Sequence, residues 1–204
     1  MLLADRYRGN RVFLVGDAAH LNPPWGGHGF NTCTGDAVNI AWKLAAVLQG
    51  WGGDALLASY ELERRPIARR TIDAAGAQEA FMAPAFRHPD LNADNAEGIR
   101  RRAEVGVALQ VKDPEFHSLG LVLGYDYPDS PIVAAELPIA EPMPVNDFTP
   151  SAHPGARLPH AWLADGSSLF DRLGDGFSLL CFSAAPSAVE AVDIPLSLID
   201  LSTE

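Results

Sequence analysis

Apolar and polar positions in the first fifty residues predict a short strand, a polar loop and a long helix. Residues 11–15 form an apolar run that suits a buried strand. From Ala37 to Leu48 apolar residues recur every three or four positions, which places them on one face of a helix. Gly50 follows where a helix C-terminal cap is expected. We therefore expect an amphipathic helix behind a Gly/Pro-rich loop.

The helical pattern continues through the middle of the chain. Asp54 can cap the next helix, whose pattern extends to about Met82. Pro66 lies inside this stretch and lacks a backbone donor, so we expect the helix to bend or restart there. Residues 83–95 contain two prolines and favour a loop, and a further helix is expected over 96–112.

The last third of the chain changes in composition. Residues 119–134 mix strand-like and turn-forming residues, and six prolines between positions 138 and 159 predict an extended connector. Residues 161–182 indicate a hairpin followed by a core strand. Ser187 could cap a short helix, and 195–201 suits a final strand. A sheet that starts so late remains unfinished in this sequence, and unpaired strand edges favour association, with a homodimer as one form of it.

Charge and composition narrow the possible partners. The 204 residues suit one domain or two small ones, and 48% apolar with 20% charged residues is typical of a globular protein. Fifteen basic and 26 acidic residues give a net charge of −11, which disfavours a nucleic-acid partner. We find neither an apolar stretch of about 20 residues nor a signal-peptide pattern, so we expect no membrane contact and a cytoplasmic location.

Several kinds of site are not supported by the residues. Cys33 and Cys181 match no metal or redox spacing, so we expect reduced thiols. A position near a helix start could lower the pKa of Cys33, but no base accompanies it. His20 and His28 lack clustered ligands, so we expect loop hydrogen bonds and no metal site. The chain also lacks a P-loop, a dinucleotide fingerprint and a serine-hydrolase elbow.

The Gly-Asp, loop and helix unit at residues 16–48 suits an electron-rich ligand. Asp17 follows the predicted strand, where a carboxylate can accept hydrogen bonds from sugar or polyol hydroxyls. Gly26, Gly27 and Gly29 permit close backbone approach and positive φ. The helix start beyond them has unpaired N–H groups and a partial positive charge. The unit therefore fits a ligand with hydroxyls at one end and developing negative charge at the other.

The motifs of this unit resemble the second FAD-binding segment of flavin-dependent aromatic hydroxylases. These enzymes are the para-hydroxybenzoate and phenol hydroxylase group of monooxygenases. The resemblance rests on Gly-Asp-Ala-Ala-His at 16–20, Pro-Pro-x-Gly-Gly-x-Gly-x-Asn at 23–31 and Gly-Asp-Ala-x-Asn-x-x-Trp-Lys-Leu-Ala at 35–45. Ser-Tyr-Glu-x-Glu-Arg-Arg-Pro at 59–66 and the stretch 123–133 are also similar to the family.

The resemblance implies a fold class and domains. Residues 154–171 resemble the start of the family's thioredoxin-like C-terminal domain. The implied class is an α/β fragment with a strand, loop and long helix of an FAD-binding domain, a helical middle and the beginning of a thioredoxin-like α/β domain. We expect residues 1–135 to be the incomplete C-terminal part of an FAD-binding monooxygenase domain, 136–159 a Pro-rich connector, and 160–204 a truncated thioredoxin-like start.

The resemblance also implies roles for individual residues. In the family the aspartate of Gly-Asp binds the ribityl chain, a loop proline lies against the isoalloxazine ring, and N–H groups at the helix start meet the flavin N1/O2 edge. The implied cofactor-binding set is Gly16, Asp17, Pro24, Gly27, Gly29, Phe30 and Asn31. No catalytic side chain is implied. We expect Trp42 to be a packing residue, whereas Trp25 suits packing and a substrate cavity equally well.

The implied activity is that of an FAD-dependent, NAD(P)H-consuming monooxygenase. It would hydroxylate a phenolic or polyketide-like aromatic with O2 through a flavin C4a-hydroperoxide, as part of a longer enzyme. The family's Gly-x-Gly-x-x-Gly unit, which holds the ADP half of FAD, is not found in these 204 residues. We therefore expect the chain alone to bind FAD weakly or not at all and to be inactive. A non-catalytic truncated remnant, and an FAD-dependent epoxidase or quinone hydroxylase, stay open as alternatives.

Overall fold

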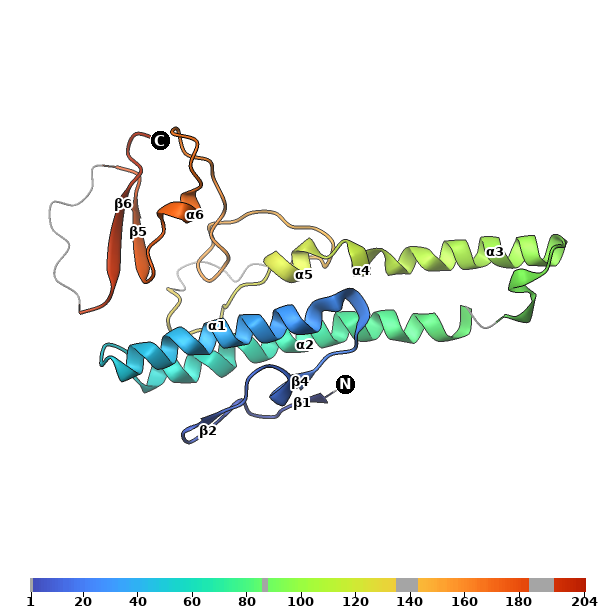
Figure 1. Cartoon of the computed structure of the whole chain (residues 1–204), viewed down its shortest axis with the longest axis horizontal. Helices are drawn as coiled ribbons and strands as arrows, with labels where there is room; N and C mark the ends of the chain where they lie inside the picture. Colours follow the sequence, from blue (N-terminus) through green and yellow to red (C-terminus); the bar gives the residue numbers. More distant parts are fainter. Residues whose placement is uncertain (1, 86–87, 135–142, 184–192) are drawn as a thin grey trace.

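Two long antiparallel helices form the spine of the molecule. The computed structural model describes residues 2–85, 88–134, 143–183 and 193–204. Figure 1 shows the spine helices side by side, the N-terminal strands on one side and a small C-terminal unit on the other. The elements are β1 Leu2–Leu3, β2 Arg8–Gly9, β3 Val12–Phe13, η1 Gly16–Ala18, β4 His20–Leu21, η2 Trp25–Gly27, α1 His28–Leu48, α2 Asp54–Ala85, η3 Pro89–Asn92, α3 Ala96–Ala108, η4 Leu109–Lys112, α4 Asp113–Phe116, α5 Leu119–Leu123, α6 Leu169–Arg172, β5 Phe177–Cys181 and β6 Leu196–Asp200.

The N-terminal strands are short and pair locally. β1 pairs antiparallel with β4, and β2 with β3 in a hairpin. The buried strand expected over 11–15 is therefore wrong in extent and burial: only Val12–Phe13 are paired, and Val12 is 65% exposed. A two-stranded hairpin covers its residues on one side only, which leaves Val12 open to solvent. The main core lies between these strands and the spine, around Tyr7, Ala19, Ile40, Tyr60 and Ala68.

Helix α1 begins at His28, nine residues before the apolar pattern starts. Its first turns bury Thr32 and Asp36 in place of apolar residues, which hid them from the periodicity. The expected C-terminal cap is confirmed, because Gly50 has φ +88° and its N–H donates to Val47 O at 3.1 Å.

Helix α2 runs through Pro66 as one continuous helix, so of the two outcomes expected there, a bend or a restart, the restart does not occur. Arg64 on one side of the proline and Ile67 and Ala68 on the other are buried, which holds both parts against the rest of the molecule. Asp54 is the first residue of α2, and its described contact is an ion pair with Arg8 in place of the expected cap.

The helix expected over 96–112 is confirmed as α3 and η4. The stretch 119–134, which mixes strand-like and turn-forming residues, begins with the short helix α5, and no strand occurs in it. The close approach of residues 143–147 explains this difference. The Leu121 N–H donates to Val145 O at 3.1 Å, and a Cβ at Gly120 would lie 1.8 Å from Pro144 O.

The C-terminal unit has its own small core of Leu163, Leu169 and Leu201. The two strands expected near 177–182 and 195–201 are confirmed as β5 and β6, which pair in parallel. The first is not the core strand that we expected, because in β5 only Cys181 is buried while Phe177 and Leu179 are exposed. Residues 143–159 contain no helix or strand. The expected helix cap at Ser187 lies outside the described residues.

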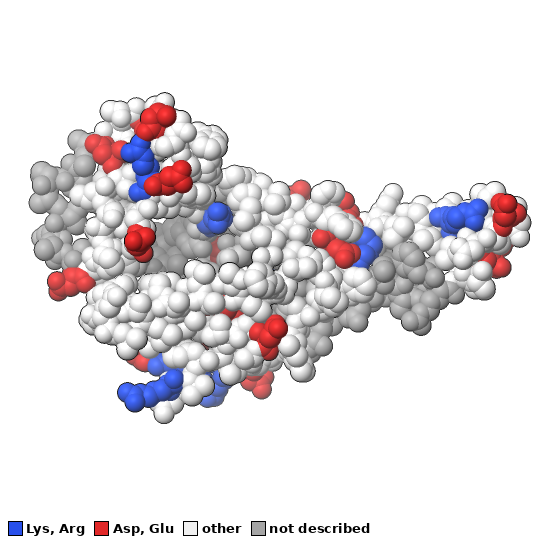
Figure 2. Space-filling view, in the orientation of Figure 1, with Lys and Arg blue, Asp and Glu red and all other residues white. Residues whose placement is uncertain are grey.

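Charged side chains are spread thinly over the surface drawn in Figure 2. Basic groups are scattered there among acidic ones, with no extended basic patch among the described residues of this face. Among the described helices none combines the length and apolarity needed to cross a bilayer.

Candidate functional site

The loop between β4 and α1 lines an open hollow of about 440 Å³. Five of the seven residues expected to bind a cofactor line it; its lining is Asp17, Leu21, Asn22, Pro23, Pro24, Gly27, Gly29, Phe30 and Cys33. Gly16 is buried beside Asp17, and Asn31 is exposed on the first turn of α1 without lining the hollow. The folded chain thus brings most of the predicted set to one place.

The N-terminus of α1 opens onto this hollow. Gly27 precedes the helix with φ +66°, and no side chain caps the first turn. A Cβ at Gly27 would meet nothing within 4 Å. The first N–H groups of a helix have no partner within it, and they carry partial positive charge. The site can therefore receive an electron-rich edge of a ligand.

Asp17 and Cys33 face each other at the rim of the hollow. The Cys33 thiol donates to Asp17 Oδ1 at 3.3 Å. Burial, helped by this hydrogen bond and by the charge of Asp17, raises the pKa of Cys33 to about 11. The lowered pKa that a helix start allows in principle does not occur. Cys33 is a protonated hydrogen-bond donor at neutral pH.

This geometry predicts slow alkylation of Cys33. At pH 8 the thiolate needed for attack on iodoacetamide is scarce, and the rate should rise steeply only as the pH approaches 11. Asp17→Asn removes one group that raises the pKa, so its rate profile should shift to lower pH. Mass spectrometry of the labelled peptide follows the reaction, with Cys33→Ser as the control. A profile centred near pH 8 in the unchanged protein would contradict the assignment.

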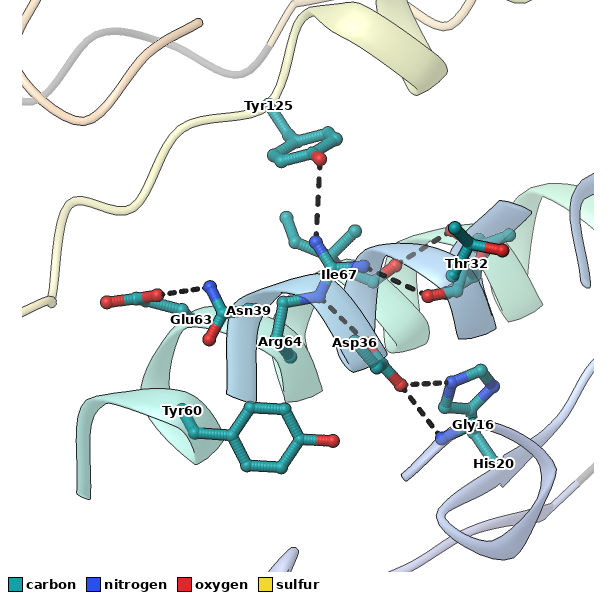
Figure 3. A network of polar contacts seen from close by, with 12 residues as sticks. Gly16, His20, Thr32, Asp36, Asn39, Tyr60, Glu63, Arg64, Ile67 and Tyr125 are labelled. Atoms are coloured by element: carbon teal, nitrogen blue, oxygen red, sulfur yellow. Dashed lines mark hydrogen bonds and ion pairs between the residues drawn. The ribbon is translucent and has the colours of Figure 1, made fainter. Parts of the chain in front are cut away.

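A buried carboxylate, Asp36, joins the Gly-Asp loop to both spine helices (Figure 3). Its Oδ2 accepts the Gly16 N–H at 3.2 Å and lies 2.8 Å from His20 Nε2. Its Oδ1 accepts Arg64 Nε at 2.8 Å. The side chains of Asp36 and Arg64 are 0% and 2% exposed. This ion pair therefore lies in the interior, directly behind the loop that carries Asp17.

Arg64 uses its other nitrogens to reach a third segment of the chain. Nη1 donates to Tyr127 Oη at 3.1 Å and Tyr125 Oη at 3.5 Å, and Nη2 to Thr32 O at 3.3 Å. Burial opposes its charge, but Tyr127 and the hydrogen bond to Asp36 dominate and keep the pKa of Arg64 above its usual value. Burial also raises the pKa of Tyr127 to about 12, so its phenol stays neutral.

His20 is fixed by contacts on both ring nitrogens. Nδ1 lies 3.3 Å from Asn22 Oδ1, whereas Asn22 Nδ2 has no partner within the described part of the chain. Turning the Asn22 amide by 180° lets Nδ2 donate to Nδ1, while Nε2–H donates to Asp36. Both ring nitrogens of His20 have a partner in this arrangement. The predicted loop hydrogen-bonding role of His20 is confirmed.

A second buried ion pair joins α1 and α2. Glu63 Oε2 accepts Lys43 Nζ and Asn39 Nδ2, both at 2.6 Å, and Oε1 accepts Ser130 Oγ at 2.7 Å. Lys43 also donates to Ser59 Oγ at 2.6 Å. Burial works to raise the pKa of Glu63, but the three donors outweigh it and lower that pKa. The carboxylate is therefore the stable form.

Helix α2 also holds the N-terminal segment through main-chain atoms. Tyr60 Oη donates to Leu14 O at 2.9 Å, and Arg65 Nε to Ala4 O at 3.0 Å. Glu61 Oε2 accepts the N–H groups of residues 7 and 8 at 2.8 and 3.2 Å. The stretch 59–66 is therefore a set of anchors for the residues that lead into the candidate site.

Sequence patterns did not assign a role to these buried polar residues, although the resemblance included them. Asp36, Asn39 and Lys43 recur at helical spacing, as do Ser59 and Glu63. Polar residues repeated on one helix face usually indicate a solvated face, so their burial could not be read from spacing alone. The signal that could have found them is complementarity, because a buried charge needs a partner.

Two tryptophans near the site differ in surroundings. Trp42 stacks on Trp51 at 6.4 Å and meets Phe177 edge-on, away from the loop hollow, which confirms its packing role. Trp25 lines a separate hollow of about 150 Å³, with Lys112 Nζ 4.5 Å from the centre of its ring.

Within the described residues no cluster of three His, Cys, Asp or Glu side chains could hold a metal ion.

Gly16→Ala should cost more stability than Gly27→Ala. Both glycines have positive φ, +58° and +66°, and an alanine costs about 1–2 kcal/mol there. A Cβ at Gly16 would also lie 3.0 Å from Cys33 Cβ, whereas one at Gly27 meets nothing within 4 Å. We expect Gly16→Ala to lower the free energy of unfolding by about 1–3 kcal/mol more, measured by urea denaturation. Equal losses would contradict the close packing of Gly16 on α1.

Known proteins share both the sequence and the fold. A family model described as FAD binding domain matches residues 2–75. The chain is 36% identical over 187 residues to the FAD-dependent monooxygenase opdD of Penicillium oxalicum. The aligned region covers 88% of this chain and 36% of that protein. The chain is also 42% identical over 181 residues to the tetracenomycin A2 monooxygenase-dioxygenase of Streptomyces glaucescens, covering 87% and 28%.

A solved structure extends the similarity to almost the whole chain. RebC soaked with chromopyrrolic acid and containing bound 7-carboxy-K252c superposes with a TM-score of 0.84 at 40% identity, over 97% of this chain and 39% of that one. The chain thus spans about a third of the length of the proteins it matches.

Proposed function

The chain belongs to the family of flavin-dependent aromatic hydroxylases, and on that premise we propose that the protein containing it is an FAD-dependent monooxygenase. It would consume NAD(P)H and O2 and hydroxylate a phenolic or polyketide-like aromatic. The observation that carries the proposal is the hollow at the start of α1, lined by Asp17, Pro24 and the first residues of the helix.

The residues around the hollow fit the flavin-ring half of FAD. The Asp17 carboxylate is exposed at the rim and can accept hydrogen bonds from ribityl hydroxyls. Pro24 offers a flat apolar surface to the ring, and the N–H groups of Gly29, Phe30 and Asn31 suit its pyrimidine edge. When bound, FAD would supply the redox chemistry and the activation of oxygen. A preorganised donor at an edge that gains negative charge contributes on the order of 3 kcal/mol.

We also propose the domain division that the sequence suggests. Residues 1–135 would be part of the FAD-binding monooxygenase domain, 136–159 a connector, and 160–204 the start of a thioredoxin-like domain. The separate core of Leu163, Leu169 and Leu201 and the parallel pairing of β5 with β6 support the last of these assignments.

The test uses the protein as its gene encodes it. We expect it to retain FAD and to oxidise NAD(P)H faster when phenolic or polyketide-like aromatics are added, with a hydroxylated product seen by mass spectrometry. A protein that takes up no FAD and oxidises no NAD(P)H with any of these compounds would contradict the proposal.

Asp17→Asn should weaken FAD binding by about 10- to 100-fold, because hydrogen bonds to a charged acceptor contribute about 1.5–3 kcal/mol. Fluorescence titration of FAD into the apoprotein measures the loss. Asp73→Asn, an exposed carboxylate on α2, is the matched control and should leave the affinity unchanged. Equal affinities for Asp17→Asn and the unchanged protein would remove Asp17 from the site.

A further inference from the structure

The side chain of Asp17 has little of its own to hold it in place. It is exposed, and its described contact is the Cys33 thiol at 3.3 Å, a weak donor. A carboxylate that must meet ribityl hydroxyls has to point in one direction. That direction must therefore be set mainly by the backbone at residues 16 and 17.

The backbone at Gly16 is fixed from both sides. Its N–H donates to Asp36 Oδ2 at 3.2 Å, and its carbonyl accepts the Ala19 N–H at 2.7 Å. Its φ of +58° and its close approach to Cys33 strongly favour glycine at this position. The Gly16 N–H belongs to the peptide bond between residues 15 and 16, and the Gly16 carbonyl belongs to the one that joins Asp17. Asp36 and Ala19 thus hold the peptide bonds on both sides of Gly16, the residue that leads into Asp17.

The carboxylate of Asp36 is itself held by two further donors. Arg64 Nε lies 2.8 Å from Oδ1, and His20 Nε2 lies 2.8 Å from Oδ2. All three partners of Asp36 are donors, so an amide of the same shape would turn its own NH2 group toward at least one of them. The Gly16 N–H and Arg64 Nε reach different oxygens, so this position requires a side chain that accepts through both of them, as a carboxylate does.

We propose that Asp36 is a positioning residue of the flavin site. It holds the Gly16 N–H and thereby aims the Asp17 carboxylate at the ribityl chain, and Arg64 fixes Asp36 from α2. Asp36 does not line the hollow itself. The inference rests on the proposed function, because it concerns the same FAD site.

A double-mutant cycle in FAD affinity separates positioning from general stability. The full protein is titrated with FAD as Asp36→Asn, as Asp17→Asn, and with both changes. Glu63→Gln is the matched control, because it breaks an equally buried ion pair between the same two helices without touching residues 16–20.

We expect Asp36→Asn to weaken FAD binding by about tenfold or more, and Glu63→Gln by less than about threefold. In the Asp17→Asn background the Asp36→Asn change should cost less than about threefold, because the group it positions is gone. If Asp36→Asn does not fold, Arg64→Lys takes its place in the same cycle. Lysine keeps the positive charge beside Asp36 but lacks the planar guanidinium group and its several N–H donors.

Two outcomes overturn the inference. One is full additivity of the two changes, and the other is a loss for Asp36→Asn no larger than that for Glu63→Gln. Absence of FAD binding by the unchanged protein is a different result, because it would remove the proposed function itself.

Discussion

Arg64→Met should lower the free energy of unfolding by about 3–5 kcal/mol, the usual cost of removing one partner from a buried ion pair. The change leaves the Asp36 carboxylate fully buried beside His20 and the Gly16 N–H without its cation. It also removes the separate N–H donors that reach the Tyr127 phenol and Thr32 O. Methionine fills much of the volume, so the loss reports the charge and the hydrogen bonds.

Arg69→Met is the control for this first variant. Arg69 lies on α2 and is exposed, and surface changes of this kind stay within about 0.5 kcal/mol. Urea denaturation followed by circular dichroism gives both values under the same conditions. A loss below about 1 kcal/mol for Arg64→Met would show that Asp36 finds enough stabilisation elsewhere.

Lys43→Met should have an effect of similar size at neutral pH. The change removes the buried cation beside Glu63, whereas Asn39 and Ser130 still donate hydrogen bonds to it. We therefore expect the free energy of unfolding to fall by about 3–5 kcal/mol. Adding Glu63→Leu removes the buried carboxylate that Lys43→Met leaves without a cation. The double variant should therefore be more stable than Lys43→Met alone, with the coupling measured as a double-mutant cycle.

The pH dependence of Lys43→Met gives a second measurement. In the unchanged protein the pKa of Glu63 lies below its usual 4.5 despite burial, owing to hydrogen bonds from Lys43, Asn39 and Ser130. The stability from this group is therefore present above pH 4.5 and is lost as the pH falls through the folded-state value. Without Lys43, burial should raise the pKa of Glu63.

As the pH falls, Glu63 is therefore protonated in Lys43→Met before it is protonated in the unchanged protein. The difference in stability between the unchanged protein and Lys43→Met should shrink as the pH falls below about 6 toward about 4, at constant ionic strength. Denaturation curves at each pH measure it. A difference that stays constant or grows over this interval would mean that Glu63 remains charged without its lysine.

Local signals in the sequence were sufficient for the long helices, apart from the start of α1, and for much of the candidate hollow. The apolar period placed α3 and the C-terminal half of α1, and Gly50 marked the end of α1 by its left-handed φ. The motif at 23–31 placed Pro24, Gly27, Gly29 and Phe30 around one hollow. The roles assigned to these residues toward FAD remain predictions.

Contacts between distant segments decided the features that the sequence did not reveal. The start of α1 was hidden because its buried face carries Thr32 and Asp36, whose partners lie on other elements. Helix α2 continues through Pro66 because buried residues on both sides hold it. The stretch 119–123 is helical because residues 143–147 pack against it. Periodicity describes one element at a time, and these outcomes depend on pairs of elements.

The anchors in stretch 59–66 have a consequence for how freely the N-terminal segment can vary. Tyr60, Glu61 and Arg65 contact carbonyl or amide groups of residues 4, 7, 8 and 14, which every amino acid except proline supplies alike. A library randomised at exposed positions of the N-terminal segment should therefore retain many folded members. A library randomised at the three anchor positions should retain few folded members. Selection for folding would therefore act on the anchor side chains of α2, whereas substitutions at their partners in the N-terminal segment would be nearly neutral.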